Sequence, residues 1–271
     1  MGHHLQTTVN YYADPGDGSP PTPVYVGSTQ VTNKRPTISV PVTVTDVTGN
    51  ESAFTLDVHG FAYHRHESAE AADGFHDETA LKQRYYPECE ELLRTLTGAT
   101  RVLAFDHKVR RGPAFWHALN PTNNTASRGP LHNAHVDQSY AGAVLRLRDV
   151  LPPTEADAIV RSGRRWQILN VWRPIKEVRS SPLAVADARS VADEDLVAAS
   201  IMYGTSGRRM ESWAVKAPPA GEGREHGWFY KWRQGVGEVV VIKCFDSLEE
   251  EGVARRAVHC AVEDVRCLVF Y

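Results

Sequence analysis

Apolar and polar residues alternate along several short segments of the chain, which is the pattern of strands with one buried face. Residues 37–47 (TISVPVTVTDV) alternate in this way, and residues 53–63 (AFTLDVHGFAY) continue in the same style. Residues 101–111 (RVLAFDHKVRR) and 166–174 (WQILNVWRP) predict two further strands, the second ended by its proline. Residues 8–36 are rich in Gly, Pro, Ser and Thr and predict an extended, turn-rich arm.

Helical patterns are concentrated between the early strands and before residue 166. The sequence Asp77-Glu78-Thr79 predicts a helix start. A second helix is expected over residues 85–97, with proline in its first turn and glycine after its end. A third is expected over residues 152–162 (PPTEADAIVRS), where prolines and a threonine begin the pattern.

The C-terminal half is rich in strand patterns. Extended segments are predicted at residues 182–191, 211–215, 228–232, 238–245 and 255–271, and residues 116–131 have the composition of a loop. Neither an internal repeat nor a linker between two cores is evident, so we expect one domain over residues 1–271. Residues 1–115 would supply strands and helices that pack on a β-barrel, and residues 116–271 most of that barrel.

Composition and charge restrict the class of protein. The net charge of −3 and pI near 6.5 argue against a general nucleic-acid binder. The local basic clusters are expected to be solvated or ion-paired. The four cysteines are too few and scattered for a disulfide framework. No apolar run is long enough to span a membrane and no secretory signal is seen, so we expect a cytoplasmic protein without a membrane partner.

The first chemical signal is His135-Val136-Asp137. In a strand, residues two apart point to the same face, so the imidazole and the carboxylate can bind one metal together. Two histidines and one carboxylate on one face of an octahedral metal mark non-haem iron(II) oxygenases, because the remaining positions stay open for co-substrate and O₂. The short motif by itself is weak, and a third ligand must come from elsewhere in the chain.

The C-terminus offers that ligand. A glycine turn and a buried strand (residues 237–245) are followed by His259 and then by Arg266 in a last strand. This order suits a double-stranded β-helix, a jelly-roll or cupin-like barrel, in a mainly β protein with added helices. Alternation would direct Arg266 inward with Leu268 and Phe270. A guanidinium can bind a carboxylate through two parallel hydrogen bonds, and the distal carboxylate of 2-oxoglutarate is the expected partner.

Two alternatives to this ligand set are open. His226 is the main rival to His259, but it precedes the glycine-turn strand, whereas the β-helix order requires the distal ligand after it. Cys244 and Cys260 are soft ligands that suggest zinc, but alternation turns Cys260 away from His259. Taken singly, His259 is more often a core histidine and Arg266 more often an ion-pair residue, but together and in this order they favour the metal site.

A series of motifs along the chain resembles a known family. The motifs are NYYADPGDGSPP, YYPECEELLRTLTGATRVLAFDHKVRR, AHVDQSYAGA, ILNVWRPI, PLAVAD, KCFDS, VHCAV and VRCLVFY. Together they identify the chain as similar to the AsaB, CmcJ and gibberellin-desaturase-like family of Fe(II)/2-oxoglutarate-dependent oxygenases. The resemblance implies a jelly-roll fold, Fe(II) and 2-oxoglutarate as cofactors, and ascorbate as a reductant. Compared with the family, the segments at residues 27–36 and 260–266 are short.

The resemblance also implies that the strand at residues 166–174 lines the pocket. Asn170 is then expected to contact the cofactor and Trp172, on the same face, the substrate. Arg173, on the other face unless Pro174 twists the strand, is a candidate anchor for a substrate carboxylate, although an ion pair at a strand end is nearly as common.

Further candidates rest on single positions. Alternation from the ligand pair puts Ser139 beside the metal as a substrate contact. Tyr203 is placed to donate a hydrogen bond to 2-oxoglutarate, although a buried structural tyrosine is the more common role. Arg110 follows a strand and is in reach of a substrate carboxylate. No catalytic residue beyond the metal ligands is expected.

The expected function is therefore an Fe(II)/2-oxoglutarate-dependent dioxygenase of secondary metabolism. It would hydroxylate, desaturate or oxidatively cyclise a small metabolite bearing a carboxylate, for example by closing an aziridine ring on an amino acid. O₂ is the second substrate, and a homodimer is one expected assembly. Two other classes stay open, a non-catalytic cupin-like partner or binding subunit and a zinc-dependent hydrolase.

Overall fold

The structure is a computed structural model. It describes residues 2–26, 35–71, 74–111, 131–204, 206–219, 221, 223–260 and 264–271. The loop expected at residues 116–131 lies outside the described residues except for its last one. Two segments, residues 27–36 and 260–266, were noted as short compared with the family. Residues 27–34 of the first and 261–263 of the second lie outside the described residues as well.

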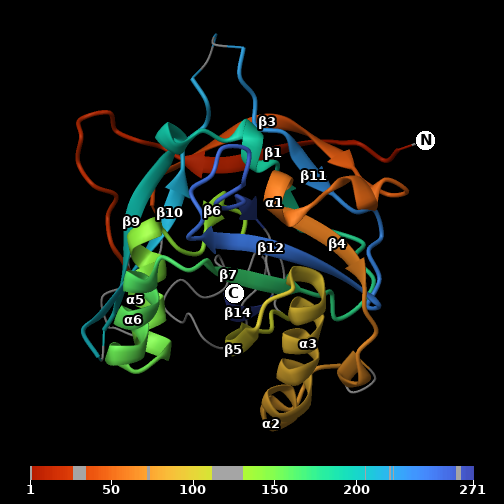
Figure 1. Ribbon diagram of the computed structural model, residues 1–271. Coiled ribbons are helices and arrows are strands. Elements are labelled where there is room, and N and C mark those ends of the chain that lie inside the picture. The colour runs from red at the N-terminus through yellow and green to blue at the C-terminus, as the bar shows by residue number, and fades with distance from the viewer. Residues whose placement is uncertain are drawn as a thin grey trace.

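Nine strands of the described chain form one strongly curled sheet (Figure 1). Its order is β1-β3-β11-β8-β13-β6-β10-β9-β2. The strands are β1 Leu5–Tyr12, β2 Val24–Val26, β3 Thr37–Asp46, β6 His135–Val136, β8 Ala184–Ala186, β9 Leu196–Tyr203, β10 Arg208–Val215, β11 Trp228–Tyr230 and β13 His259–Cys260. The sheet thus joins strands from both ends of the chain, and the N-terminal strands extend the barrel instead of forming a loose arm.

A second sheet of five described strands faces the first, in the order β4-β12-β7-β14-β5. These strands are β4 Phe61–Arg65, β5 Arg101–Lys108, β7 Trp166–Trp172, β12 Glu238–Asp246 and β14 Asp264–Phe270. The prediction for the last strand is confirmed: Leu268 and Phe270 pack in one core cluster, while Cys267 and Val269 pack in another on the opposite face.

Helices cover the outside of this double sheet (Figure 1). They are α1 Leu56–His59, α2 Glu78–Ala80, a π-helical turn Leu81–Tyr85, α3 Tyr86–Thr97, α5 Tyr140–Val150 and α6 Pro153–Ser162, with short 3-10 turns at Glu51–Ala53, Ala69–Ala71, Ala188–Ser190 and Asp193–Asp195. Helix α3 packs against β5 and β14. Buried Leu93 of α3 shares a core cluster with Leu169 and Val171 of β7.

The local structure differs from the prediction, or adds to it, in three places. Residues 53–63 are not continuous strand, because a helical turn begins at Leu56 and ends at Gly60, whose φ of 80° suits a residue without a side chain. The two helices expected between residues 77 and 97 run on through the π-helical turn. Helix α5 was not expected; it begins where the Ser139 hydroxyl accepts the backbone N–H of Gly142.

The glycine at position 142 allows α5 to approach β10 closely. A Cβ atom there would lie 2.0 Å from the carbonyl oxygen of Glu211. No real side chain tolerates that separation, so glycine sets the distance between the helix and the strand that borders β6. The helix thereby supports the strand pair that carries the candidate site.

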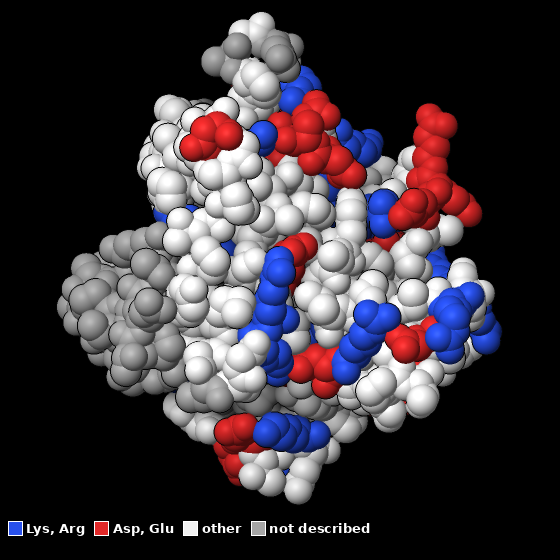
Figure 2. All heavy atoms as spheres, turned by 90° about the vertical axis from the view of Figure 1, so that its left-hand side faces the viewer, with Lys and Arg blue, Asp and Glu red and all other residues white. Residues whose placement is uncertain are grey.

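The basic segments at residues 161–165 and 255–256 contain ion-paired arginines. Arg255 pairs with Glu249, and Arg165 pairs with Asp246 and Asp57. Figure 2 shows basic and acidic side chains lying next to one another on one face of the molecule. Among the described residues, no helix has the length and apolar character needed to cross a bilayer.

Candidate metal centre

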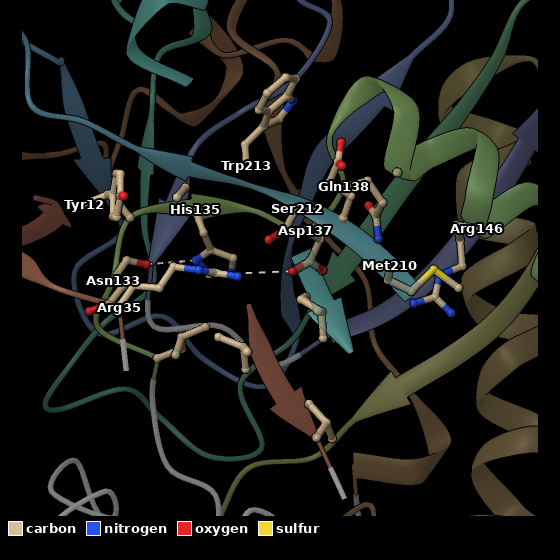
Figure 3. A pocket seen from close by; sticks show the side chains of 18 of the residues that line it. Tyr12, Arg35, Asn133, His135, Asp137, Gln138, Arg146, Met210, Ser212 and Trp213 are labelled. Atoms are coloured by element: carbon tan, nitrogen blue, oxygen red, sulfur yellow. Dashed lines mark hydrogen bonds and ion pairs between the residues drawn. The ribbon is translucent and has the colours of Figure 1, made fainter. Parts of the chain in front are cut away.

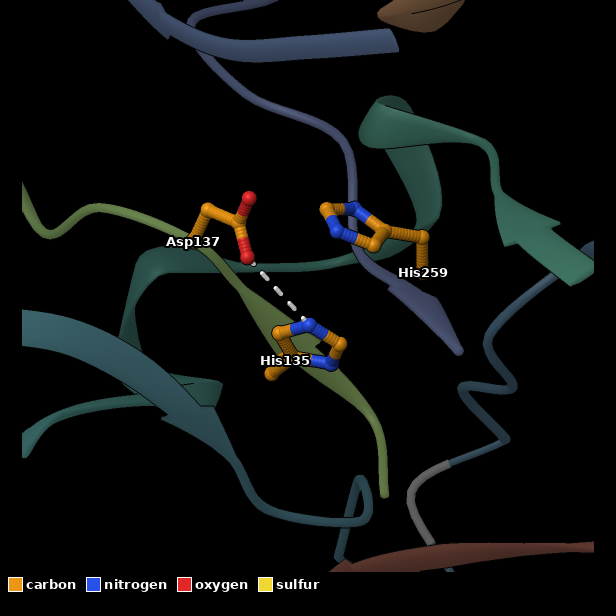
Figure 4. Close-up of side chains that lie close together, drawn as sticks. All are labelled: His135, Asp137 and His259. Atoms are coloured by element: carbon orange, nitrogen blue, oxygen red, sulfur yellow. Dashed lines mark ion pairs between the residues drawn. The ribbon is translucent and has the colours of Figure 1, made fainter. Parts of the chain in front are cut away.

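Two short strands in the middle of the large sheet bring the predicted ligands together. His135 of β6 and His259 of β13 are register partners in neighbouring antiparallel strands. Asp137 follows β6 directly. The ligand atoms of the three side chains lie within 4.8 Å of one another, and Figure 4 shows the three side chains converging. The spacing of the first pair and the strand order of the third residue thus lead to one place.

Both imidazoles are oriented by a hydrogen bond to the backbone carbonyl two residues earlier in the chain. Nδ1 of His135 lies 2.9 Å from the carbonyl oxygen of Asn133, and Nδ1 of His259 lies 3.0 Å from that of Ala257. Since a carbonyl only accepts, each Nδ1 carries the hydrogen and each Nε2 keeps its lone pair. Nε2 of His259 is buried and has no hydrogen-bond partner among the described residues. A buried nitrogen lone pair of this kind fits a metal ion.

The carboxylate of Asp137 presents its two oxygens to different partners. Oδ1 lies 3.5 Å from Nε2 of His135, on the side of the histidines. Oδ2 accepts a hydrogen bond of 3.0 Å from Asn170 and lies 2.9 Å from Nη2 of Arg266. Oδ2 is therefore fixed by Asn170 and Arg266, while Oδ1 faces the imidazoles. This arrangement suits a metal ligand that binds through a single oxygen.

The charges of the site match a cation. Burial, reinforced by the neighbouring His135, lowers the pKa of His259 to about 4, so this imidazole is neutral near pH 7. Burial alone would raise the pKa of Asp137, but the Arg266 guanidinium and the two histidines hold it well below its usual range. Two imidazole nitrogens and one carboxylate form the donor set of an open iron(II) site.

His135 and Asp137 reach the wall of a cavity of about 340 Å³, whereas His259 is fully buried behind them. That volume lies in the range of small-molecule sites, about 300–1,000 Å³. Strand β10 contributes a large share of the wall, with further residues from β1, β2 and β9, and Figure 3 shows it from close by. Arg266, Arg110 and Tyr203 line the cavity, as their predicted roles require.

Ser139 and Asn170 have structural partners. Ser139 is fully buried, caps α5 and donates a hydrogen bond of 2.6 Å to Oε1 of Glu211. It does not line the cavity, because β6 is only two residues long and the alternation stops before residue 139. Asn170 lies beside the site, but its amide supports Asp137, as described above.

Arg173 and Trp172 are not part of the cavity wall. Nε of Arg173 donates to the hydroxyl of Tyr85 at 3.0 Å, and Nη1 donates to the carbonyl of Val236 at 2.7 Å, while Nη2 contacts His66. The side chain therefore lies on the helix-covered face, as alternation from Asn170 predicts, and away from the site. Trp172 is buried in a core cluster.

The rival ligand His226 lies elsewhere. Its ring nitrogens contact the Tyr11 hydroxyl and Oδ2 of Asp195, each at 3.1 Å. Cys260 is buried in the core, where burial raises the pKa of its thiol to about 12. Neither residue belongs to the group formed by the two histidines and Asp137.

Because His226 is buried, we expect the stability of the protein to depend on pH. Burial lowers the pKa of His226 below its value in the unfolded chain, about 6.5, although Asp195 opposes this. Below pH 6.5 the unfolded chain thus binds more protons, and acidification favours unfolding. The urea midpoint of the metal-free protein is expected to be lower at pH 5 than at pH 7, with a smaller difference in His226→Gln. The exposed His4→Gln should retain the full difference; an equal effect of both substitutions would contradict this explanation.

Several residues of the wall had no signal in the sequence. Tyr12 ends β1, Arg35 lies just before β3, and Met210 and Trp213 come from β10. They are brought to the site by strand pairing between distant segments. Gln138 follows Asp137 directly; its side chain is buried, and Oε1 has no hydrogen-bond partner among the described residues.

Comparisons with known proteins agree with this geometry. Residues 9–268 match the family model of an oxidoreductase/YMDC permease-like domain. The chain is 33% identical to the hydroxylase/desaturase efuI of Hormonema carpetanum over 98% of this chain and 95% of that protein. It is 32% identical to the alpha-ketoglutarate-dependent dioxygenase phiK of a fungal species, over 95% of this chain and 88% of that one.

A solved structure shares the fold. It is that of the iron and alpha-ketoglutarate-dependent endoperoxidase NvfI, with a TM-score of 0.81 and 23% identity over 99% of this chain and 98% of that chain. At this identity the likeness shows the fold alone. The expected mainly β jelly-roll is thereby confirmed.

Proposed function

The chain belongs to the hydroxylase/desaturase family of Fe(II)/2-oxoglutarate-dependent oxygenases, and from this membership we propose that His135, Asp137 and His259 bind the iron of an enzyme that oxidises a small metabolite. The family implies Fe(II) and 2-oxoglutarate as cofactors and O₂ as a second substrate. The alternatives of a zinc hydrolase and a non-catalytic binding subunit are not favoured.

The observation that carries the ligand assignment is the convergence of two imidazole Nε2 atoms and one carboxylate oxygen beside a cavity. When bound, iron(II) with 2-oxoglutarate supplies the oxidising chemistry, in which O₂ is consumed, 2-oxoglutarate is converted to succinate and CO₂, and substrate carbon is oxidised. The protein contributes the orientation of the ligands, the burial of His259 and the shape of the cavity.

The test of this function is direct. The pure protein, loaded anaerobically with Fe(II), is expected to bind one iron per chain and to develop a weak visible band on addition of 2-oxoglutarate. Admission of O₂ should then yield succinate. A protein that binds zinc but not iron, or that forms no succinate under these conditions, would refute the proposal.

We propose Arg266 as the anchor of the distal carboxylate of 2-oxoglutarate, with Tyr203 at the same cavity. The guanidinium lines the cavity beside Asp137, 3.3 Å from Oδ2 of Asp106 and 2.9 Å from Oδ2 of Asp137. A guanidinium can bind a carboxylate through two parallel hydrogen bonds, so its place in the cavity wall beside the metal ligands supports contact with 2-oxoglutarate.

Arg266→Gln is therefore expected to raise the KM for 2-oxoglutarate by about 10- to 100-fold, as expected for loss of a charge-assisted pair. Iron binding should persist. The measurement is succinate formation at varied 2-oxoglutarate, together with iron content. Arg146→Gln, a second arginine of the cavity wall, is the control and should leave this KM unchanged. Loss of iron with an unaltered KM would instead make Arg266 a residue that positions Asp137.

The finer features of the partners are also proposals. The substrate is proposed to bear a carboxylate, which the basic wall of the cavity supports. A cytoplasmic homodimer is proposed as well. It is supported by the exposed apolar side chains Leu145 and Val160 on the neighbouring helices α5 and α6. Light scattering on the pure protein gives the mass that decides between monomer and dimer.

A further inference from the structure

Arg35 is an arginine of the cavity wall whose hydrogen bonds to the described residues go to neutral carbonyl groups. It precedes β3, and its Nε and Nη2 donate hydrogen bonds of 3.0 and 2.8 Å to the carbonyl oxygens of Thr22 and Ser200. These two contacts fix the guanidinium between the N-terminal segment and β9. Arg35 lines the same cavity as His135 and Asp137.

Arg35 differs from three neighbouring cations of the cavity wall, each of which lies beside a carboxylate. Arg146 pairs with Asp149 at 3.0 Å, Lys108 lies 3.7 Å from Asp106, and Arg266 pairs with Asp137. For Arg35, no described residue supplies a carboxylate within ion-pair distance. Burial lowers the pKa of Arg35, and the Tyr12 hydroxyl opposes this shift. A partly buried cation without a counter-charge is costly, so an anion that binds beside it gains a strong interaction.

The surroundings of Arg35 describe the rest of the ligand. Figure 3 shows Arg35 and Tyr12 on one side of the His135–Asp137 pair, with Gln138 and Arg146 on the other. Apolar residues from β2, β9 and β10 lie along the same wall: Val24, Val26, Ile201 and Met210. A molecule with an acidic end at Arg35 and an apolar body along these strands would therefore pass in front of His135 and Asp137.

We propose that Arg35 selects the primary substrate by binding its carboxylate, while the apolar body of that substrate lies along β2, β9 and β10 at the metal ligands. This inference rests on the proposed function and adds the residue that determines specificity. It separates two carboxylate sites, Arg35 for the substrate and Arg266 for 2-oxoglutarate. Oxidation is then directed to a carbon away from the acidic end, because that end is held beside the N-terminal strands.

The experiment uses octanoate and octanamide as probes of equal size that differ in charge. Each is titrated calorimetrically, without O₂, into the protein loaded with Fe(II) and saturated with 2-oxoglutarate. The wild type is expected to bind octanoate at least about 10-fold more tightly than octanamide, as a charge-assisted hydrogen bond implies. In Arg35→Gln the two affinities should become equal, with the affinity for 2-oxoglutarate unchanged.

Two further variants separate charge from structure. Thr37→Glu adds a carboxylate to the same wall and leaves the hydrogen bonds of Arg35 in place, so it should also remove the preference for octanoate. Arg146→Gln removes a cation that is already paired and should keep the preference. The inference is overturned if the wild type shows no preference for octanoate or if Arg35→Gln keeps that preference. It is also overturned if Arg35→Gln lowers the affinity for 2-oxoglutarate instead. Failure of the proposed function would give a different result, namely a wild-type protein that binds neither iron nor 2-oxoglutarate.

Discussion

Asp137→Ala is expected to lose iron and, with it, succinate formation. The substitution removes the only carboxylate of the described ligand group and leaves the Arg266 guanidinium beside two histidines. Removal of a partner that merely orients a ligand already costs about 10- to 100-fold in metal affinity. Loss of the ligand itself should cost at least about 100-fold by the same comparison. Iron content after anaerobic loading and desalting, measured beside succinate formation, gives both effects.

Glu211→Gln is the matched control for this prediction. Glu211 is another carboxylate of the cavity wall, but it pairs with Arg209 and Ser139 and does not belong to the ligand group. It should therefore retain iron. Full iron content in Asp137→Ala, or equal loss in both variants, would show that the three converging side chains are not the metal site.

Asp246→Ala is expected to give the largest loss of stability. Lys243 and Asp246 are both fully buried, and Nζ lies 2.7 Å from Oδ2 of Asp246. Arg165 and Gln167 also donate to this carboxylate, each at 2.6 Å. The substitution leaves the buried ammonium with only the half-exposed Asp57, at 2.9 Å. Removal of one partner of a buried pair typically costs about 3–5 kcal/mol of unfolding free energy, which urea unfolding measures.

An exposed ion pair supplies the comparison. Lys82 and Glu78 lie 2.7 Å apart on the surface of the α2 segment, with side chains 55% and 72% exposed. Glu78→Ala should leave the urea midpoint close to that of the wild type, because an exposed ion pair contributes little to stability. Similar small effects in both variants would mean that the Lys243–Asp246 network relaxes into contact with water when it is broken.

Patterns within one element were read correctly from the sequence. The apolar alternation of residues 37–47, the buried run at 166–172 and the proline-started helix at 152–162 all became the expected elements, β3, β7 and α6. Each depends on neighbours within a few positions. The prediction for residues 53–63 was wrong because a single glycine with left-handed backbone angles, Gly60, ends a helical turn inside an apparently alternating segment.

Side-chain roles that depend on distant segments were harder to predict. Ser139 was placed by extending the alternation of a strand that is only two residues long, and its hydroxyl caps a helix instead. The predicted substrate anchor Arg173 lies on the helix-covered face, whereas Arg35 reaches the cavity through pairing of the N-terminal strands with the large sheet. No local pattern at Arg35 carries that information, since its position follows from contacts with segments far along the chain.

The pairing of His135 with His259 has a mechanical consequence. A metal held by both would act as a clasp between β6 and β13, two strands far apart in the chain, and would close the intervening half of the protein into a ring. A metal that binds only the folded chain stabilises it, because the binding free energy is lost on unfolding. Iron occupancy would then set the lifetime of the protein as well as its activity: a molecule that lost its metal would become inactive and, at the same moment, easier to unfold and degrade.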